Sequence, residues 1–197
     1  MITVHSGNMS SGKSSALFDQ YTRHMIANKK CLFIAHISDK ERSKTSPFTH
    51  GYLSTKHVKP LYAHTLTSVD VSKYDYVFVD EGQWFPDLVD VVKTWASKKY
   101  GKYVYVACLN SDYKQRPLMN VVQLEIYADK VVPHRAVCTS CGSEYASCTI
   151  RTIDCDDVVA VGDLSIYKAV CRECVVNECC HEYVTVNSDG VNPSSYE

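Results

Sequence analysis

The first chemically capable residues form a glycine-rich segment near the start of the chain. Gly7-Asn8-Met9-Ser10-Ser11-Gly12-Lys13-Ser14 matches the pattern G-x-x-x-x-G-K-[ST] in full. In this pattern the backbone N–H groups point at phosphate oxygens, the lysine supplies positive charge to the outer phosphates, and the final hydroxyl can ligate Mg²⁺. We call Gly7–Ser14 the glycine loop, and it predicts a binding site for a nucleoside triphosphate.

Two adjacent carboxylates, Asp80 and Glu81, follow the apolar segment Tyr76–Val79. If that segment is a strand of a parallel sheet, its carboxyl end lies where ligands bind. One acid at such a position commonly organises the Mg²⁺ of a nucleotide site, and the second can take a proton from a substrate hydroxyl as general base. A solvated acidic turn is the alternative, and the glycine loop upstream favours the catalytic interpretation.

Cysteine is unusually frequent, with ten in the chain and eight of them between Cys138 and Cys180. The spacings Cys138-x-x-Cys141 and Cys171-x-x-Cys174 offer two pairs of thiolates to one tetrahedral Zn²⁺. Such a closed site has no open coordination position, so a structural role is expected. A disulfide framework is disfavoured because the first residues lack the basic start and apolar run of a secretory signal, and we expect a cytoplasmic protein.

The other cysteines differ in their surroundings. Cys31 and Cys108 lie in apolar segments and are expected to pack as small core residues. Cys179-Cys180-His181 follows the second pair, and it could replace a metal ligand, bind a second ion or have no role. Cys148 and Cys155 receive no role. Redox catalysis by one C-x-x-C pair is a further alternative, although neither pair follows a strand into a helix in a thioredoxin-like unit.

The charge balance argues against a general nucleic-acid-binding function. The 197 residues carry 21 Lys plus Arg and 22 Asp plus Glu, a formal charge of −1, whereas a phosphate-backbone binder needs a basic surface. No apolar run approaches the ~18 residues that a membrane span requires. The alternative function is a nucleotide-gated nucleic-acid-binding protein with a zinc knuckle, and the acidic residues that follow Cys141 disfavour it.

Apolar periodicity places these motifs on alternating strands and helices. Short apolar runs predict strands at Ile2–His5, Cys31–Ala35, Tyr76–Asp80 and Tyr103–Leu109. Helical spacing predicts helices at Ser14–Asn28 and Asp87–Ser97, and the polar residues 38–60 are expected to form a long mobile loop. This alternation indicates an α/β fold with a mostly parallel sheet.

Together, the glycine loop, the acidic strand end and the late cysteine pairs resemble the type II thymidine kinases, the family of the cellular and poxviral enzymes. The resemblance reaches to about Cys174 and is most specific in the glycine loop, Asp80–Asp87, Ala136–Cys138 and Tyr167–Cys174. It implies a P-loop NTPase-type parallel sheet flanked by helices. It also implies a small zinc-binding, β-rich C-terminal domain with a "lasso" loop at Val158–Tyr167.

The activity that the resemblance implies is ATP-dependent 5′-phosphorylation of thymidine, and of deoxyuridine, in nucleotide salvage for DNA synthesis. ATP, Mg²⁺ and a structural Zn²⁺ are the implied cofactors, and a homotetramer inhibited by thymidine triphosphate is the implied assembly. We expect an ATP-binding α/β domain at 1–135, a zinc-binding and lasso domain that binds the nucleoside at 136–183, and a flexible tail at 184–197.

The resemblance also implies roles for single residues. Glu81 matches the general base that takes the proton of the deoxyribose 5′-hydroxyl, and Asp80 matches the acid near Mg²⁺. Lys13 and Ser14 match phosphate and metal contacts, and Gln83 is assigned to the same nucleotide site. Lys13 also counts as catalytic, because it would neutralise charge on the phosphoryl group during transfer.

A second basic residue, Arg42, matches a group that neutralises the transferred phosphoryl group. In the family an aspartate precedes this arginine by two positions, whereas here the sequence reads Asp39-Lys40-Glu41-Arg42, so that Asp39 is displaced by one.

The nucleoside pocket draws residues from both expected domains. The residues implied around the base are Met9, Trp84, Leu109, Tyr113, Leu118, Gly162 and Tyr167. Trp84 and Leu118 each stand where the family has Phe. Either Cys148 or Thr149 matches the residue that reads the thymine methyl, and Thr149 is favoured because Arg151 then also aligns.

Overall fold

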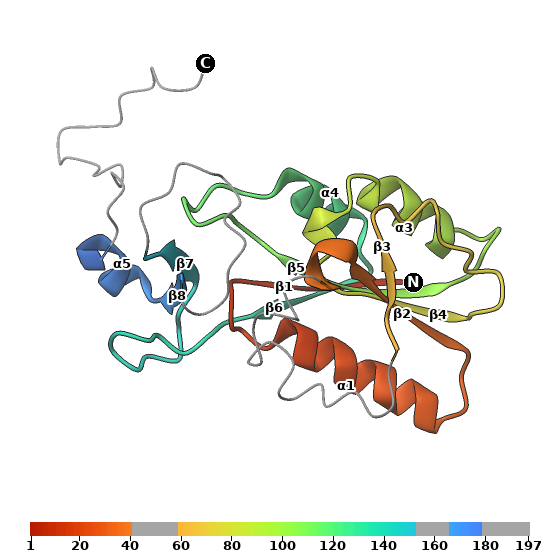
Figure 1. Ribbon diagram of the computed structural model, residues 1–197, viewed down its shortest axis with the longest axis horizontal. Helices are drawn as coiled ribbons and strands as arrows, with labels where there is room; N and C mark the ends of the chain where they lie inside the picture. Colours follow the sequence, from red (N-terminus) through yellow and green to blue (C-terminus); the bar gives the residue numbers. More distant parts are fainter. Residues whose placement is uncertain (41–58, 153–165, 179–197) are drawn as a thin grey trace, which may run out of the picture.

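The computed structural model describes residues 1–40, 59–152 and 166–178, and within these ranges six strands form one sheet (Figure 1). Every neighbouring pair in this sheet is parallel. The strands are β1 (Ile2–Gly7), β2 (Cys31–His36), β3 (Leu61–Ala63), β4 (Tyr76–Val79), β5 (Tyr103–Leu109) and β6 (Lys130–His134), in the spatial order β3-β2-β4-β5-β1-β6. The predicted α/β fold with its parallel sheet is confirmed.

Helices cover both faces of this sheet (Figure 1). The helix α1 (Lys13–Ile26) lies on one face, and α3 (Leu88–Ala96) and α4 (Met119–Tyr127) lie on the other. A short 3-10 helix, η1 (Gly82–Trp84), follows β4. Because the strands are parallel, the segments that leave β1, β4 and β5 all start at one edge of the sheet, where ligands bind in folds of this class.

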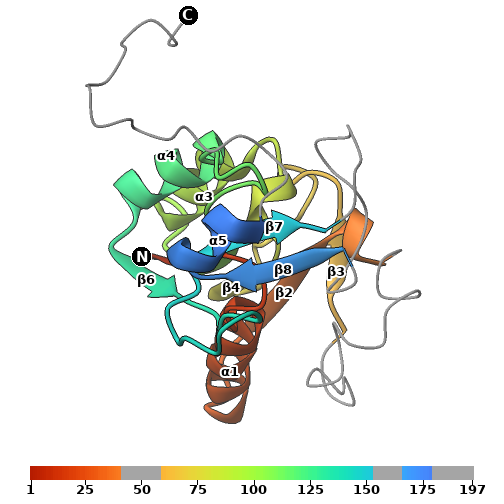
Figure 2. The same ribbon diagram turned by 90° about the vertical axis from the view of Figure 1, so that its left-hand side faces the viewer.

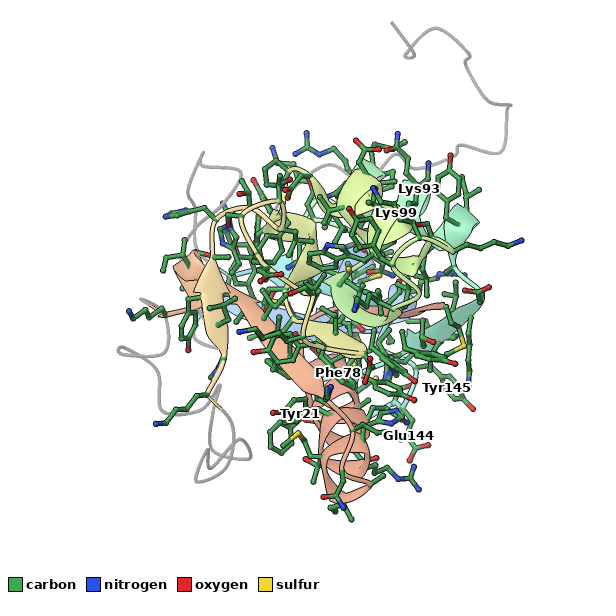
Figure 3. All side chains as sticks on the ribbon, turned by 90° about the vertical axis from the view of Figure 1, so that its right-hand side faces the viewer. Tyr21, Phe78, Lys93, Lys99, Glu144 and Tyr145 are labelled. Carbon is green, nitrogen blue, oxygen red and sulfur yellow. The ribbon has the colours of Figure 1, made fainter. Side chains whose placement is uncertain are left out.

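Alternate residues of the strands contribute to two separate cores. On β4, Phe78 packs edge to face against Tyr21 of α1, with 5.4 Å between the ring centroids (Figure 3). Its neighbours Val77 and Val79 belong to the larger core under α3 and α4. This period of two is expected for strands that are covered on both faces, and it fixes which strand side chains point toward α1.

The four predicted strands and two predicted helices are present, with small shifts at their ends. The helix α1 ends at Ile26 rather than at Asn28, which adopts a left-handed backbone with φ 56°. The expected loop is partly wrong, because residues 37–40 are helical, while 41–58 lie outside the described residues.

Two strands of the main sheet, β3 and β6, and one helix that covers it, α4, were not predicted. The strand β6 is an edge strand that pairs only with β1 among the described strands, and its sequence contains Pro133. A proline has no N–H to give to a ladder, so it is compatible with an edge strand. In a sequence, a proline inside a short apolar run disfavours a strand.

A smaller unit contains β7 (Cys148–Arg151), β8 (Tyr167–Val170) and α5 (Arg172–Glu178). The two strands are antiparallel and share a compact core with Ala136, Ala146 and Val175, separate from the two cores of the main sheet. Figures 1 and 2 show this unit at the edge of the main sheet where β1 ends. No helix in the described ranges is long and apolar enough to cross a membrane.

Candidate active site

The glycine loop connects β1 to α1 through a backbone path that requires its two glycines. Gly12 caps α1 with φ 81°, a conformation that residues with side chains rarely adopt. Gly7 lies so close to β6 that a Cβ there would overlap the backbone oxygen of His134. The first N–H groups of α1 have no partner within the helix and form, with the loop, a natural site for an anion.

Lys13 is partly buried in this loop. Its Nζ donates hydrogen bonds to the backbone oxygen of Asn8, at 2.6 Å, and to Ser11 Oγ, at 3.4 Å. Burial lowers the pKa of Lys13, and the carboxylates of Glu81 and Asp80 oppose that effect. The Lys13 ammonium therefore lies between the glycine loop and two acids. A phosphate group bound by the loop would be attracted by this positive charge.

The acid at the end of β4 lies next to the start of α1. Ser14 Oγ donates a hydrogen bond to Asp80 Oδ1 at 2.9 Å. Burial, reinforced by the neighbouring Glu81, raises the pKa of Asp80 to about 7, although the bond from Ser14 acts in the opposite direction. A hydroxyl and a carboxylate are oxygen ligands of the kind that Mg²⁺ takes beside a bound phosphate, so these two residues fit a magnesium ion.

Glu81 is held in an unusual conformation. Its backbone has φ 53°, and its N–H donates to Asp80 Oδ1 at 3.0 Å. The amide nitrogen of the buried Gln83 donates to the Glu81 carboxylate, and Gln83 Oε1 accepts a hydrogen bond from the N–H of Leu109 at 3.0 Å. Asn120 donates to the backbone oxygen of Gln83 at 3.0 Å. A positive φ at a non-glycine residue costs about 1–3 kcal/mol, and such conformations cluster at functional sites.

Hydrogen bonds attach β7 to the glycine loop. The N–H of Met9 donates to Thr149 Oγ1 at 3.0 Å, and Asn8 Nδ2 donates to the backbone oxygen of Cys148 at 3.3 Å. From the segment after β5, Gln115 Nε2 donates to the backbone oxygen of Thr149 at 2.8 Å. Residues about 140 positions apart in the sequence thereby form one wall beside the nucleotide loop.

A buried arginine joins two of the aromatic residues expected at the base pocket. The Arg151 guanidinium lies 3.8 Å from the ring centroid of Tyr113, and its Nη2 donates to the hydroxyl of Tyr167 at 3.1 Å. The guanidinium is also 5.5 Å from the ring centroid of Tyr167. Stacking of this kind fixes the orientation of both rings.

The structure brings most of the predicted nucleoside residues to the same edge. Met9, Trp84, Leu109 and Leu118 are half-buried there, and Leu118 packs against the main core. Two predicted residues, Arg42 and Gly162, lie outside the described residues. Asp39 is buried, and its charge is close enough to raise the pKa of Asp80.

The four predicted zinc ligands come together next to β8 and α5. The sulfur atoms of Cys138, Cys141, Cys171 and Cys174 all lie within 4.8 Å of one another, and the Sγ atoms of Cys141 and Cys171 are 3.7 Å apart. A tetrahedron with Zn–S bonds of about 2.3 Å separates its sulfurs by about 3.8 Å. The donor set therefore fits one Zn²⁺.

One thiol of this cluster favours its metal-binding form. Burial raises the pKa of Cys138, but hydrogen bonds from the backbone N–H groups of Cys171, Cys141 and Ser140 outweigh it and lower the pKa to about 6. The Cys171 N–H lies 3.3 Å from Cys138 Sγ. A thiolate is the form that ligates metals, so these backbone groups prepare the site.

The other described cysteines are not among the four clustered sulfurs. Cys108 and Cys148 are buried, each in one of the hydrophobic cores, and Cys31 is half-buried beside the core under α1. The expected core role of Cys31 and Cys108 agrees with these positions. Cys155 and the segment Cys179-Cys180-His181 lie outside the described residues.

Sequence reasoning missed four residues that support the site. Gln115 and Asn120 bind the backbone of Thr149 and Gln83, and their roles have no local signal in the sequence. The other two are His5 and His134, whose rings meet beside the glycine loop. A histidine inside an otherwise apolar strand was the available signal for His5.

Comparisons with known proteins agree with this geometry. The family model described as thymidine kinase matches residues 1–175. A thymidine kinase 1 of Dictyostelium discoideum is 34% identical over 179 residues, covering 88% of this chain and 76% of that protein. A thymidine kinase of vaccinia virus (strain Ankara) is 33% identical over 172 residues, covering 86% and 93%. A thymidine kinase of Acanthamoeba polyphaga mimivirus is 30% identical over 184 residues, covering 88% and 81%.

Proposed function

Because this chain belongs to the thymidine kinase family, we propose that it phosphorylates thymidine, taking the γ-phosphoryl group of ATP and transferring it to the 5′-hydroxyl. Deoxyuridine, which differs from thymidine only by a methyl group on the base, is the second proposed substrate. A methyl group contributes only modestly to discrimination in an apolar pocket.

The observation that carries this proposal is the convergence of three groups at the carboxyl edge of the sheet. The glycine loop offers N–H groups and Lys13, Ser14 binds Asp80 at 2.9 Å, and Glu81 follows directly. This is the set that phosphoryl transfer needs, namely a cradle for phosphates, oxygen ligands for Mg²⁺ and a carboxylate for the nucleophile.

We assign the chemical roles accordingly. Glu81 accepts the proton of the 5′-hydroxyl. Gln83, which is itself fixed by the N–H of Leu109, donates to the Glu81 carboxylate and holds it in place. Asp80 and Ser14 would hold Mg²⁺, which supplies charge neutralisation for the phosphates when bound. Lys13, with Arg42 as the second proposed cation, stabilises the charge on the transferred group.

The proposed nucleoside pocket lies between the main sheet and the smaller unit. Thr149 and the stacked Tyr113, Arg151 and Tyr167 support it, because they link β7, β8 and the segment after β5 at the glycine loop. The remaining proposed contacts are Met9, Trp84, Leu109, Leu118 and Gly162. A pocket built of hydrogen bonds to a base edge rejects analogues that leave its polar groups unpaired.

The cysteine cluster supports a structural Zn²⁺ at the base of the smaller unit. The sulfur spacing and the lowered pKa of Cys138 are the observations behind this assignment. The separate core of the smaller unit likewise supports the proposed domain boundary near residue 136. The homotetramer, which rests on the family resemblance alone, and the cytoplasmic location stay proposals.

The test is a substrate panel with purified protein, Mg²⁺ and ATP. We expect monophosphate from labelled thymidine and deoxyuridine, and little from deoxycytidine, deoxyadenosine or deoxyguanosine. The Lys13→Ala variant should lose this activity, whereas Lys99→Ala, a change at an exposed lysine (Figure 3), should retain it. Failure of wild-type protein to phosphorylate thymidine would overturn the proposal.

A further inference from the structure

Two histidines that the catalytic assignment does not use form a pair beside the glycine loop. His5 Nδ1 lies 2.9 Å from His134 Nε2, and His5 is only 5% exposed. In the pairing of β1 with β6, Val132 lies opposite His5 and His134 lies opposite Gly7. His134 is two residues beyond Val132, so both rings project from the same face of the sheet. That face is the one covered by α1, because Val4, next to His5, belongs to the opposite core.

His134 also contacts the glycine loop directly. It forms a hydrogen bond with the backbone of Ser11, and this bond favours the protonated ring, so the ring donates and the carbonyl accepts. The backbone oxygen of His134 lies against Gly7. One residue of the edge strand therefore contacts both the start and the middle of the loop that would bind phosphate.

The proton count of the pair leaves one open position. Two neutral imidazoles carry two ring protons, and here one lies between the rings and one at the Ser11 carbonyl. The one ring nitrogen left with neither a proton nor a hydrogen bond is His5 Nε2, which is buried and has no hydrogen-bond partner among the described residues. An added proton goes to that atom, and either ring can then carry the charge, since the proton between the rings can shift.

The charges around the pair are cationic. Burial, followed by the charges of His134 and Lys130, lowers the pKa of His5 to about 4. Burial and the charge of Lys13 lower the pKa of His134. On the remaining neighbouring strand, β5, the residue opposite His5 is the uncharged Ala107. The negative charge of a triphosphate bound at Lys13 would outweigh the positive charge of that lysine. It would therefore favour protonation of the His5–His134 pair.

We propose that the His5–His134 pair positions the glycine loop through Ser11 and couples nucleotide binding to the uptake of a proton from solvent. The proposal rests on the proposed function in one respect, because it takes a nucleoside triphosphate as the ligand of the loop. Binding the triphosphate and protonating the pair stabilise each other, so the affinity for nucleotide rises as the pH falls.

The experiment measures binding without turnover. Titration calorimetry with Mg²⁺ and the non-hydrolysable adenosine 5′-(β,γ-imido)triphosphate, at about pH 6 and in buffers of different ionisation enthalpy, gives the number of protons taken up. Wild-type protein is compared with His134→Gln and His5→Gln, and with His64→Gln as an exposed histidine control. Titration of the ligand itself contributes equally to all four proteins and cancels in the comparison.

We expect wild type and His64→Gln to take up about half a proton more than either pair variant. This difference corresponds to a relative affinity that changes about threefold per pH unit. Equal proton uptake in wild type and both pair variants, with parallel dependence of affinity on pH, would overturn the proposal while leaving the kinase assignment intact. A wild-type protein that binds no nucleotide would overturn the ATP-dependent function and this inference with it.

Discussion

Ser14 Oγ donates a hydrogen bond to Asp80 Oδ1 over 2.9 Å, and this single contact joins the first turn of α1 to the end of β4. The two residues are 66 positions apart, and β5 lies in the sheet between β4 and β1, the strand that precedes α1. The contact brings a hydroxyl and a carboxylate to the position where Mg²⁺ would meet the phosphates.

Replacement of Ser14 tests that pairing. We expect Ser14→Ala to lower kcat/KM for Mg-ATP by about 100-fold, as the loss of one stabilising group in phosphoryl or acyl transfer commonly does. Ser14→Thr keeps the hydroxyl and should retain most of the activity. Steady-state kinetics over a range of Mg²⁺ concentrations provides the measurement, and equal activity of the alanine and threonine variants would contradict the metal role.

Glu81→Gln separates chemistry from binding. Loss of a general base costs about 10²–10⁴-fold in rate, and an amide cannot take the proton of the 5′-hydroxyl. We therefore expect kcat to fall at least about 100-fold. The affinity for adenosine 5′-(β,γ-imido)triphosphate should stay close to that of wild type. Glu144→Gln, at an exposed position (Figure 3), is the matched control. Near-normal turnover of Glu81→Gln would remove this residue as the base.

The cysteine cluster predicts one tightly held zinc ion per chain. Cys171→Ser should lose the ion and unfold the smaller unit, because metal binding and folding are coupled at closed thiolate sites. Cys31→Ser, outside the cluster, should retain both metal and fold. Metal analysis by mass spectrometry and circular dichroism measure the two effects, and soluble, active protein without zinc would contradict the assignment.

Thr149 is expected to stabilise the glycine loop through the N–H of Met9. Thr149→Val removes the acceptor and leaves a partly buried N–H unpaired, at a cost of about 1 kcal/mol or more in the free energy of unfolding. Thr149→Ser keeps the oxygen and should cost less. Urea denaturation measures the free energies, and the KM for thymidine, measured alongside, should rise for the valine variant. Equal stability of the two variants would show that the Met9–Thr149 bond is not needed.

The buried His5 predicts a pH dependence of stability. The pKa of His5 is about 4 in the folded protein, whereas an unperturbed histidine, as in the unfolded chain, has a pKa of 6.5. The unfolded chain therefore binds more protons between these two pH values. The stability contributed by neutral His5 is fully present above pH 6.5 and is lost as the pH falls toward about 4, by at most about 3 kcal/mol. The difference in unfolding free energy between wild type and His5→Gln should shrink across this window. Groups away from the His5–His134 pair titrate equally in both proteins, and a constant difference from pH 7 to about pH 4 would contradict the prediction.

Local sequence pattern determined the chemistry-bearing motifs and most of the elements that carry them. The glycine loop is set by a fixed spacing of small residues, the acidic pair by its position after an apolar run, and the cysteine cluster by two C-x-x-C pairs. The glycine loop, the acidic pair and each single C-x-x-C pair depend on residues within a few positions of one another, so no knowledge of distant contacts was needed to recognise them. The same holds for the strands Tyr76–Val79 and Tyr103–Leu109, whose apolar runs are continuous.

Only the tertiary structure decided which distant residues meet. Thr149 reaches Met9 across 140 positions, and His134 reaches His5 across 129, because β7 packs against the glycine loop and β6 adds to the edge of β1. Such contacts follow from strand order and packing, which leave no periodicity in the sequence near either partner. The tertiary structure therefore determines which residues support the site. The sequence motifs identify the residues that are expected to carry out its chemistry.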